Sequence, residues 1–140
     1  GVSVAVTEKS VFYDCKSVLE LLSEHSIDLI VLAGFLLKIP NEIVASYSGR
    51  MINIHPALLP KFGGAGMYGK HVHEAVKKAG ELRSGITIHL VNEHFDEGKL
   101  LFQATVNLVS DDTPESIAGK VQQLEQRHFP RVLEYFCLGL

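Results

Sequence analysis

The sequence has few cysteines, no block of basic residues and no long apolar run, and each of these absences excludes a class of protein. Only Cys15 and Cys137 are present, near opposite ends of the chain. They predict neither a disulfide framework nor a clustered cysteine metal site, which favours the reducing cytoplasm. No apolar run approaches the ~20 residues of a membrane-spanning helix. The net charge of −3, without a lysine- or arginine-rich block, argues against nucleic-acid and membrane-surface binding.

What remains is the composition of one globular domain. Of the 140 residues, 46% are hydrophobic and 21% are charged, which is enough apolar material to bury a core. No internal repeat, low-complexity tract or linker divides the chain, so we expect residues 1–140 to form a single domain.

Hydrophobic periodicity predicts that strands and helices alternate along the chain. Short apolar runs indicate strands over 2–6, 28–33, 51–55, 85–91 and 100–106. Amphipathic segments indicate helices over 15–25, 40–48, 70–78 and from 114 onward, after a capping box that begins at Asp112. Pro130 is expected to kink or restart the last helix. Because runs that are apolar throughout are typical of parallel strands covered on both faces, the fold class is α/β with a mostly parallel sheet and a hairpin near the end.

The segment FGGAGMYGKH, residues 62–71, partly matches two nucleotide-binding patterns. Gly64, Gly66 and Gly69 have the spacing of a dinucleotide fingerprint, but that fingerprint starts directly at a strand end, and here a long loop intervenes. The range 64–70 resembles a phosphate loop, but a histidine follows its lysine where a magnesium-binding serine or threonine is required. A nucleotide-binding domain that uses the Gly64–Lys70 loop therefore stays an alternative, and a flap beside a site is favoured.

Polar side chains at two strand ends form a better candidate for a reaction centre. Asn53 and His55 leave the carboxyl end of the predicted strand 51–55 on the same face, where open α/β sheets bind ligands. An amide N–H beside an imidazole suits an oxyanion that develops on a carbonyl. Asp96 follows another buried strand, and if it reaches His55 its charge should raise the pKa of the imidazole. Each residue also has an ordinary alternative, as a turn cap, a buried histidine or a hairpin residue.

The histidines raise the question of a metal site. Four of them lie between residues 71 and 94: His71, His73, His89 and His94. Two of these share a predicted helix, but their side chains point in different directions. No cysteine or Glu-x-x-His partner completes a ligand set, so we expect no metal.

Four sequence blocks resemble those of the phosphoribosylglycinamide formyltransferase family of folate-dependent enzymes: VLAGFLLKIP, INIHPALLPKF, SGITIHLVNEHFDEGKLLFQA and VQQLEQRHFP. The resemblance implies a three-layer, Rossmann-like fold with helices on both faces of the sheet. It also implies transfer of a formyl group from 10-formyltetrahydrofolate to the amine of glycinamide ribonucleotide in purine biosynthesis. The first strand and phosphate-binding loop of the family have no counterpart here. Residues 1–140 are therefore expected to form the C-terminal two-thirds of the catalytic domain, without its N-terminal strands.

The resemblance further implies roles for individual residues. Asn53 and His55 would stabilise the tetrahedral oxyanion, and Asp96 would orient and charge His55 and help to move protons. Glu125 and Gln122 match positions that hold the ribonucleotide, and Lys61 is expected near its phosphate. The positions that match the pterin pocket are Leu36, Leu37, Ile39, Val91, Asn92, Glu93 and Phe95.

The implied partners are small molecules, namely glycinamide ribonucleotide and the co-substrate 10-formyltetrahydrofolate, with no metal, nucleic acid or membrane. A homodimer is left open. Formyltetrahydrofolate deformylase and methionyl-tRNA formyltransferase are the alternatives within the same chemistry, because they share the NIHPALLP block and its downstream aspartate.

Overall fold

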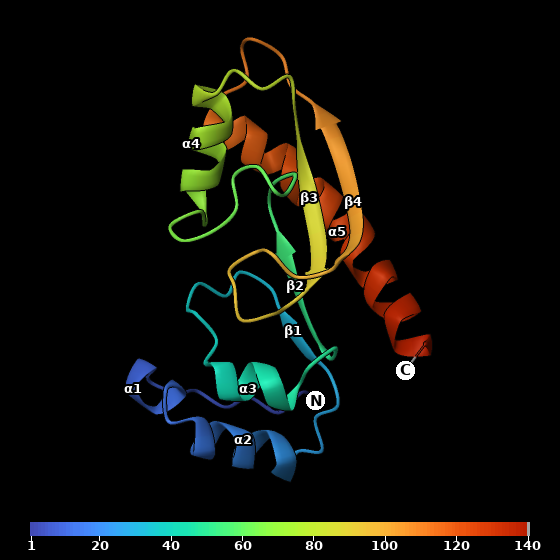
Figure 1. Cartoon of the computed structure of the whole chain (residues 1–140). Coiled ribbons are helices and arrows are strands. Elements are labelled where there is room, and N and C mark those ends of the chain that lie inside the picture. Colours follow the sequence, from blue (N-terminus) through green and yellow to red (C-terminus); the bar gives the residue numbers. More distant parts are fainter. Residues whose placement is uncertain (140) are drawn as a thin grey trace.

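A computed structural model describes residues 1–139 as a four-stranded sheet with helices around it. The strands are β1 (Ile30–Leu32), β2 (Met51–His55), β3 (Arg83–Leu90) and β4 (Leu100–Asn107), and they lie side by side in that order. The helices are α1 (Lys9–Phe12), α2 (Cys15–Glu24), α3 (Asn41–Ser46), α4 (Lys70–Lys78) and α5 (Pro114–Leu138). Figure 1 shows α5 running along β3 and β4, with α4 at one end of the molecule and α2 and α3 at the other.

Two hydrophobic cores lie on opposite faces of the sheet. Met51 and Ile52 are consecutive residues of β2, so their side chains point to opposite faces. Met51 belongs to a cluster with Ile43 from α3, against which side chains of α2 pack. Ile52 belongs to a second cluster with Val76 from α4 and Ile117 from α5. Helices therefore cover both faces, in agreement with the predicted α/β class.

The prediction of a mostly parallel sheet is wrong. β1 and β2 are parallel, but β2 pairs antiparallel with β3, and β3 pairs antiparallel with β4. The prediction relied on strands that are apolar throughout, and β3 is buried along most of its length. A strand covered on both faces is apolar whatever its direction, because burial does not depend on the orientation of the neighbouring strand. The apolar pattern therefore indicates that the strands are buried, but it does not indicate whether neighbouring strands are parallel or antiparallel.

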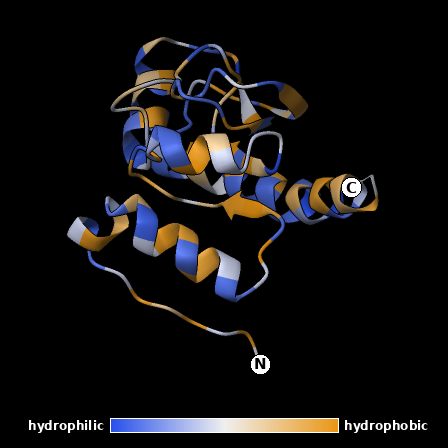
Figure 2. Ribbon diagram, turned by 60° about the horizontal axis from the view of Figure 1, so that its bottom comes forward, coloured by the Kyte–Doolittle hydropathy of each residue, from blue (hydrophilic) through white to orange (hydrophobic). Residues whose placement is uncertain are grey.

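The predicted strand over residues 2–6 is not part of the sheet. Val2, Val4 and Val6 are 93%, 84% and 95% exposed. Alternating apolar residues permit a strand, but a strand also needs a neighbour for its backbone hydrogen bonds. Within residues 1–139 no strand pairs with this segment. Figure 2 shows it as a separate stretch outside the helices.

The predicted capping box is displaced by one residue. Thr113 caps α5 and exchanges hydrogen bonds with Ser116. Asp112 instead pairs with Lys120 and accepts hydrogen bonds from the Val109 N–H and the Ser116 hydroxyl. These contacts lower the pKa of the Asp112 carboxyl to about 2. The start of α5, which forms one wall of the site described below, is thus fixed by polar contacts.

The predicted restart at Pro130 does not occur. α5 continues as one helix from Pro114 to Leu138. Side chains on both sides of the proline pack against the core of the sheet, among them Phe129 and Val132. This packing favours a continuous helix despite the hydrogen bond that proline removes. None of the helices in the described part of the chain combines the length and apolar character needed to cross a membrane.

Gly85 in β3 occupies a position where no larger side chain fits. A Cβ there would lie 2.0 Å from the Ala104 carbonyl oxygen and 2.7 Å from Leu58 Cδ2. We expect Gly85→Ala to lower the free energy of unfolding by roughly 1–3 kcal/mol, measured by urea denaturation. Gly119 is the matched control, because a Cβ at this position of α5 meets no atom within 4 Å. Gly119→Ala should instead raise the free energy of unfolding by about 0.5–1 kcal/mol. Equal effects of the two substitutions would contradict the close packing described at Gly85.

Candidate active site

The carboxyl end of β2 opens into a cavity of about 1080 Å³. Its wall comes from stretches that are distant in sequence: 32–39 from the last residue of β1 onward, 64–70 up to the first residue of α4, 91–96 after β3, and residues between 115 and 130 of α5. A volume of this order is typical of sites for small-molecule ligands. The place agrees with the rule that ligands of open α/β sheets bind outside strand ends.

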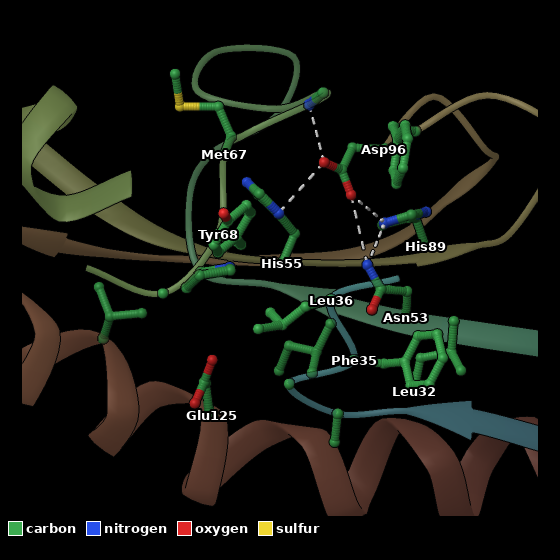
Figure 3. Close-up of a pocket in the computed structure, with 18 of the residues that line it drawn as sticks. Leu32, Phe35, Leu36, Asn53, His55, Met67, Tyr68, His89, Asp96 and Glu125 are labelled. Carbon is green, nitrogen blue, oxygen red and sulfur yellow. Dashed lines mark hydrogen bonds and ion pairs between the residues drawn. The ribbon is translucent and has the colours of Figure 1, made fainter. Parts of the chain in front are cut away.

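Asn53, His55 and Asp96 meet at one end of this cavity (Figure 3). The alternation of β2 places Asn53 and His55 on the same face. Asp96 Oδ2 lies 3.5 Å from His55 Nδ1, and Asp96 Oδ1 lies 3.5 Å from Asn53 Nδ2. Asp96 has a φ of +57°, a backbone conformation that is uncommon outside glycine and often found at functional sites. The structure thus brings together three residues that sequence analysis selected, and we call them the Asn53–His55–Asp96 cluster.

Burial lowers the pKa of His55 below its ordinary value of 6.5. The charge of Asp96 and the carbonyl of Phe62 act in the opposite direction but do not outweigh burial. Asp96 thus raises the pKa of His55, as predicted, but the larger effect of burial was not foreseen, so the expected imidazolium near neutral pH is not found in the free site. Burial also raises the pKa of Asp96, but its contacts with His89 and the Gly64 N–H outweigh this effect and hold that pKa below 3.8. The free site therefore contains a neutral imidazole beside a carboxylate.

Backbone groups of the glycine-rich segment hold the cluster in place. The Phe62 carbonyl accepts a hydrogen bond from His55 Nε2 at 2.7 Å, and the Gly64 N–H donates to Asp96 Oδ2 at 2.9 Å. The first contact assigns the hydrogen of the neutral ring to Nε2, which leaves Nδ1 free to take up a proton beside Asp96. Gly64 and Gly66 have φ values of +92° and +85°, which glycine adopts without steric cost. The segment therefore serves the site through its main chain.

His89 belongs to this site, although sequence analysis assigned it no role there. It is the register partner of Asn53 across β2 and β3, and it is 2% exposed. Its Nε2 lies 3.1 Å from Asn53 Nδ2 and 3.6 Å from Asp96 Oδ1, and its Nδ1 donates to the Leu90 carbonyl at 2.8 Å. With Nδ1 as the donor, Nε2 accepts from the Asn53 amide, and the ring therefore orients that amide. The available signal was a histidine inside the apolar strand ITIHL.

The remaining predicted residues divide into those that line the cavity and one that does not. Glu125 and Gln122 line it from α5. The residues predicted for the pterin pocket line it as well: Leu36, Leu37, Ile39, Val91, Asn92, Glu93 and Phe95. Lys61 lies elsewhere, where its Nζ pairs with Glu81 at 2.7 Å. The loop after β2 turns this side chain away from the cavity, so its predicted place near a phosphate has no support.

Glu125 lies across the cavity from the Asn53–His55–Asp96 cluster (Figure 3). Burial raises the pKa of its carboxyl above the ordinary value of 4.5. A carboxylate that is partly shielded from water binds hydroxyl donors more strongly than an exposed one. No group of three or more histidine, cysteine, aspartate or glutamate side chains among residues 1–139 is arranged to hold a metal ion.

Comparison with known families decides the affiliation of the chain. Residues 8–133 match the family model described as formyl transferase. The chain belongs to this family. The match includes every residue of the Asn53–His55–Asp96 cluster as well as Glu125.

Individual family members resemble the chain over most of its length. It is 44% identical over 118 residues to the chloroplastic phosphoribosylglycinamide formyltransferase of Arabidopsis thaliana, which covers 84% of this chain and 40% of the relative. It is 36% identical over 125 residues to the phosphoribosylglycinamide formyltransferase of Bacillus subtilis (strain 168), which covers 89% and 61%. The chain therefore spans less than two thirds of either curated relative.

Solved structures of family members share the fold. The solved structure of phosphoribosylglycinamide formyltransferase from Coxiella burnetii has 41% sequence identity and a TM-score of 0.79, and the match covers 91% of this chain and 58% of that one. A formyltetrahydrofolate deformylase from Pseudomonas syringae has 27% identity and a TM-score of 0.77, with 91% and 40% covered. The fold alone therefore does not separate transfer of a formyl group to an amine from its transfer to water.

Proposed function

We propose that this member of the formyl transferase family transfers a formyl group from 10-formyltetrahydrofolate to the amine of glycinamide ribonucleotide in purine biosynthesis. The observation that carries the proposal is the Asn53–His55–Asp96 cluster at the end of a cavity of about 1080 Å³. The acceptor is chosen because the relatives with 36% and 44% identity are phosphoribosylglycinamide formyltransferases. We place the reaction in the cytoplasm, which the low cysteine content favours.

Asn53 supplies a fixed donor for the oxyanion that forms when the amine attacks the formyl carbon. Its Nδ2 is held by His89 at 3.1 Å, whereas its contact with Asp96 at 3.5 Å is at the limit of a hydrogen bond. One N–H of the amide is thus oriented but only weakly engaged. Such a donor stabilises a developing negative charge without reorganisation, and removal of one donor from an oxyanion site costs roughly 10²–10³ in rate.

His55 responds to the same charge by taking up a proton. The free imidazole is neutral because burial lowers its pKa. A developing oxyanion nearby raises that pKa, so Nδ1 gains a proton as the tetrahedral intermediate forms. Asp96 is already ionised, and its Oδ2 lies 3.5 Å from Nδ1, where it stabilises the resulting imidazolium. The attacking neutral amine releases one proton, which His55 takes up beside Asp96, and the same proton passes to the departing folate nitrogen, so the transfer balances.

The other walls of the cavity suit the two substrates. The stretches that include Leu36, Ile39 and Val91 give an apolar wall for the flat pterin ring, with Asn92 available to bind its polar edge. Glu125 on the opposite wall is an acceptor for the hydroxyl groups of a ribose. This arrangement would place the glycyl amine between Glu125 and the Asn53–His55–Asp96 cluster.

Product analysis tests the proposal. The purified protein is incubated with 10-formyltetrahydrofolate, with and without glycinamide ribonucleotide. We expect tetrahydrofolate and formylated ribonucleotide in equal amounts when the amine is present, and no turnover without it. Formate production without the amine would support a deformylase instead, and transfer to methionyl-tRNA would support the third family activity. The His55→Ala variant, prepared in parallel, reports any contaminating activity.

A further inference from the structure

A row of three polar side chains crosses strands β2, β3 and β4, which lie side by side (Figure 1). Thr87 in β3 is the register partner of His55 in β2 and of Gln103 in β4. Side chains of directly paired residues point to the same face of a sheet. Thr87 and Gln103 do not line the cavity, so any effect that they have on a reaction there passes through other residues.

The hydroxyl of Thr87 is bonded to the loop that follows β2. It donates to the Ala57 carbonyl at 2.7 Å, and it accepts from the Leu59 N–H at 3.0 Å and from Gln103 Nε2 at 2.8 Å. A hydroxyl has one hydrogen to donate and two lone pairs, so these contacts use its full capacity. Thr87 and Ala57 are both 0% exposed. Loss of the hydroxyl would therefore leave a buried carbonyl without its partner, which is costly.

Gln103 reaches the same loop from β4. Its Nε2 donates to the Leu59 carbonyl at 3.0 Å as well as to Thr87. Both backbone groups of Leu59 are therefore held, the N–H by Thr87 and the carbonyl by Gln103. Fixing a long glutamine side chain costs rotamer entropy, which these two hydrogen bonds offset. We call the two side chains the Thr87–Gln103 clamp.

The loop held by the clamp carries the groups that position His55 and Asp96. Its Phe62 carbonyl accepts the hydrogen bond from His55 Nε2 at 2.7 Å. The side chain of Leu59 lies so close to Gly63 that a Cβ would not fit at this glycine, and the same Cβ would lie 3.2 Å from Asp96 Cβ. A displacement of Leu59 would thus be passed on to both members of the reacting pair.

We propose that Thr87 and Gln103 are positioning residues, which hold the loop after β2 and thereby orient His55 for formyl transfer. The clamp keeps the Phe62 carbonyl at Nε2 of the imidazole. Nδ1 is then the atom without a hydrogen, and it faces Asp96. The kinetic part of the inference rests on the proposed function, whereas the state of the ring can be measured in the free protein without substrate.

Two variants weaken the clamp at different places. Thr87→Val keeps the size of the side chain but has no hydroxyl, and Thr87→Ser restores the hydroxyl. Gln103→Met removes the amide of an exposed residue and leaves the core unchanged. Ser84→Ala is the matched control, because Ser84 is 1% exposed on the same strand as Thr87 and its hydroxyl has no hydrogen-bond partner within residues 1–139. Thermal unfolding of each variant checks that it is folded at the assay temperature.

The His55 ring is observed first, by ¹⁵N NMR of the free protein at a pH above the pKa of this histidine. In the wild type we expect a single tautomer with the hydrogen on Nε2, because this atom donates to Phe62. In Thr87→Val the ring signals should shift toward those of a solvated imidazole that exchanges between tautomers, and Gln103→Met should cause a smaller shift in the same direction. Thr87→Ser and Ser84→Ala should keep the wild-type signals. Wild-type ring signals in folded Thr87→Val and Gln103→Met would overturn the clamp whether or not the protein transfers formyl groups.

Steady-state kinetics then measure what the clamp contributes to the reaction. Thr87→Val should lower kcat by roughly 10-fold or more, with a smaller change in either KM, because displacement of a reacting group by about 1 Å can cost about 10²-fold in rate. Gln103→Met should lower kcat by a smaller factor, Thr87→Ser should recover most of the loss, and Ser84→Ala should keep the wild-type rate. A wild-type kcat in folded Thr87→Val, or an equal loss in Ser84→Ala, would overturn the positioning role and leave the proposed function standing.

Discussion

Replacing His55 or Asn53 with alanine is expected to lower kcat for formyl transfer by roughly 10²–10³-fold. His55 loses the ring that takes up a proton beside Asp96, and Asn53 loses the amide that His89 orients. Both effects arise in the transition state, so kcat and kcat/KM should fall together. The measurement is the initial rate at saturating concentrations of both substrates.

A matched control separates these losses from general damage to the protein. His25 is the exposed C-cap residue of α2 and does not line the cavity, so His25→Ala should retain the wild-type rate. Thermal unfolding should show that the Asn53 and His55 variants remain folded at the assay temperature. Folded variants that turn over at the wild-type rate would exclude these two residues from the chemistry.

Replacing Asp96 with asparagine is expected to lower kcat by roughly 10²–10⁴-fold. The change removes the charge that stabilises the imidazolium of His55, and it alters an oxygen that accepts from the Gly64 N–H. It should also lower the pKa of His55 further below 6.5, because the charge of Asp96 is one of the factors that raise it against burial. The shift is measured by an NMR titration of the histidine ring in the free protein.

The sign of this pKa shift distinguishes the proposed arrangement from a simpler one. If Asp96 acts on His55 only by shielding it from water, its replacement by a neutral residue of the same shape would leave the His55 pKa unchanged or raise it. Asp111→Asn is the control, because Asp111 is exposed beside the start of α5 and does not line the cavity. Its replacement should change neither the His55 pKa nor the rate.

Local sequence signals predicted the elements that position the site. The strand at 51–55 and the helix at 70–78 have the predicted bounds, because MINIH is an apolar run and KHVHEAVKK has an apolar stripe. Strand direction was not predictable, because a buried strand looks the same in a parallel and an antiparallel sheet. The prediction of a strand over residues 2–6 was wrong for a related reason, because an alternating pattern does not show whether a partner strand is present.

The candidate site was predictable where it depends on strand ends and not where it depends on packing. His55 ends the buried strand β2, Asn53 lies two residues before it on the same face, and Asp96 follows β3. Strand ends of such sheets are where ligand sites form. Predicting the role of His89 would have required the register of β2 against β3, which no local sequence pattern contains. Predicting the lowered pKa of His55 would have required the position of the loop that buries it. Predicting where Lys61 points would have required the path of the same loop.

The most direct test of the central claim is a double-mutant cycle on kcat/KM for formyl transfer with His55→Ala and Asp96→Asn. The claim is that the two side chains act as one unit, with Asp96 stabilising the charge that His55 acquires. It predicts that kcat/KM of the double variant is about that of the slower single variant. This value exceeds the one expected if the two losses multiplied by roughly 10²-fold or more. Losses that simply multiply would contradict the claim, because they would mean that the two residues act independently.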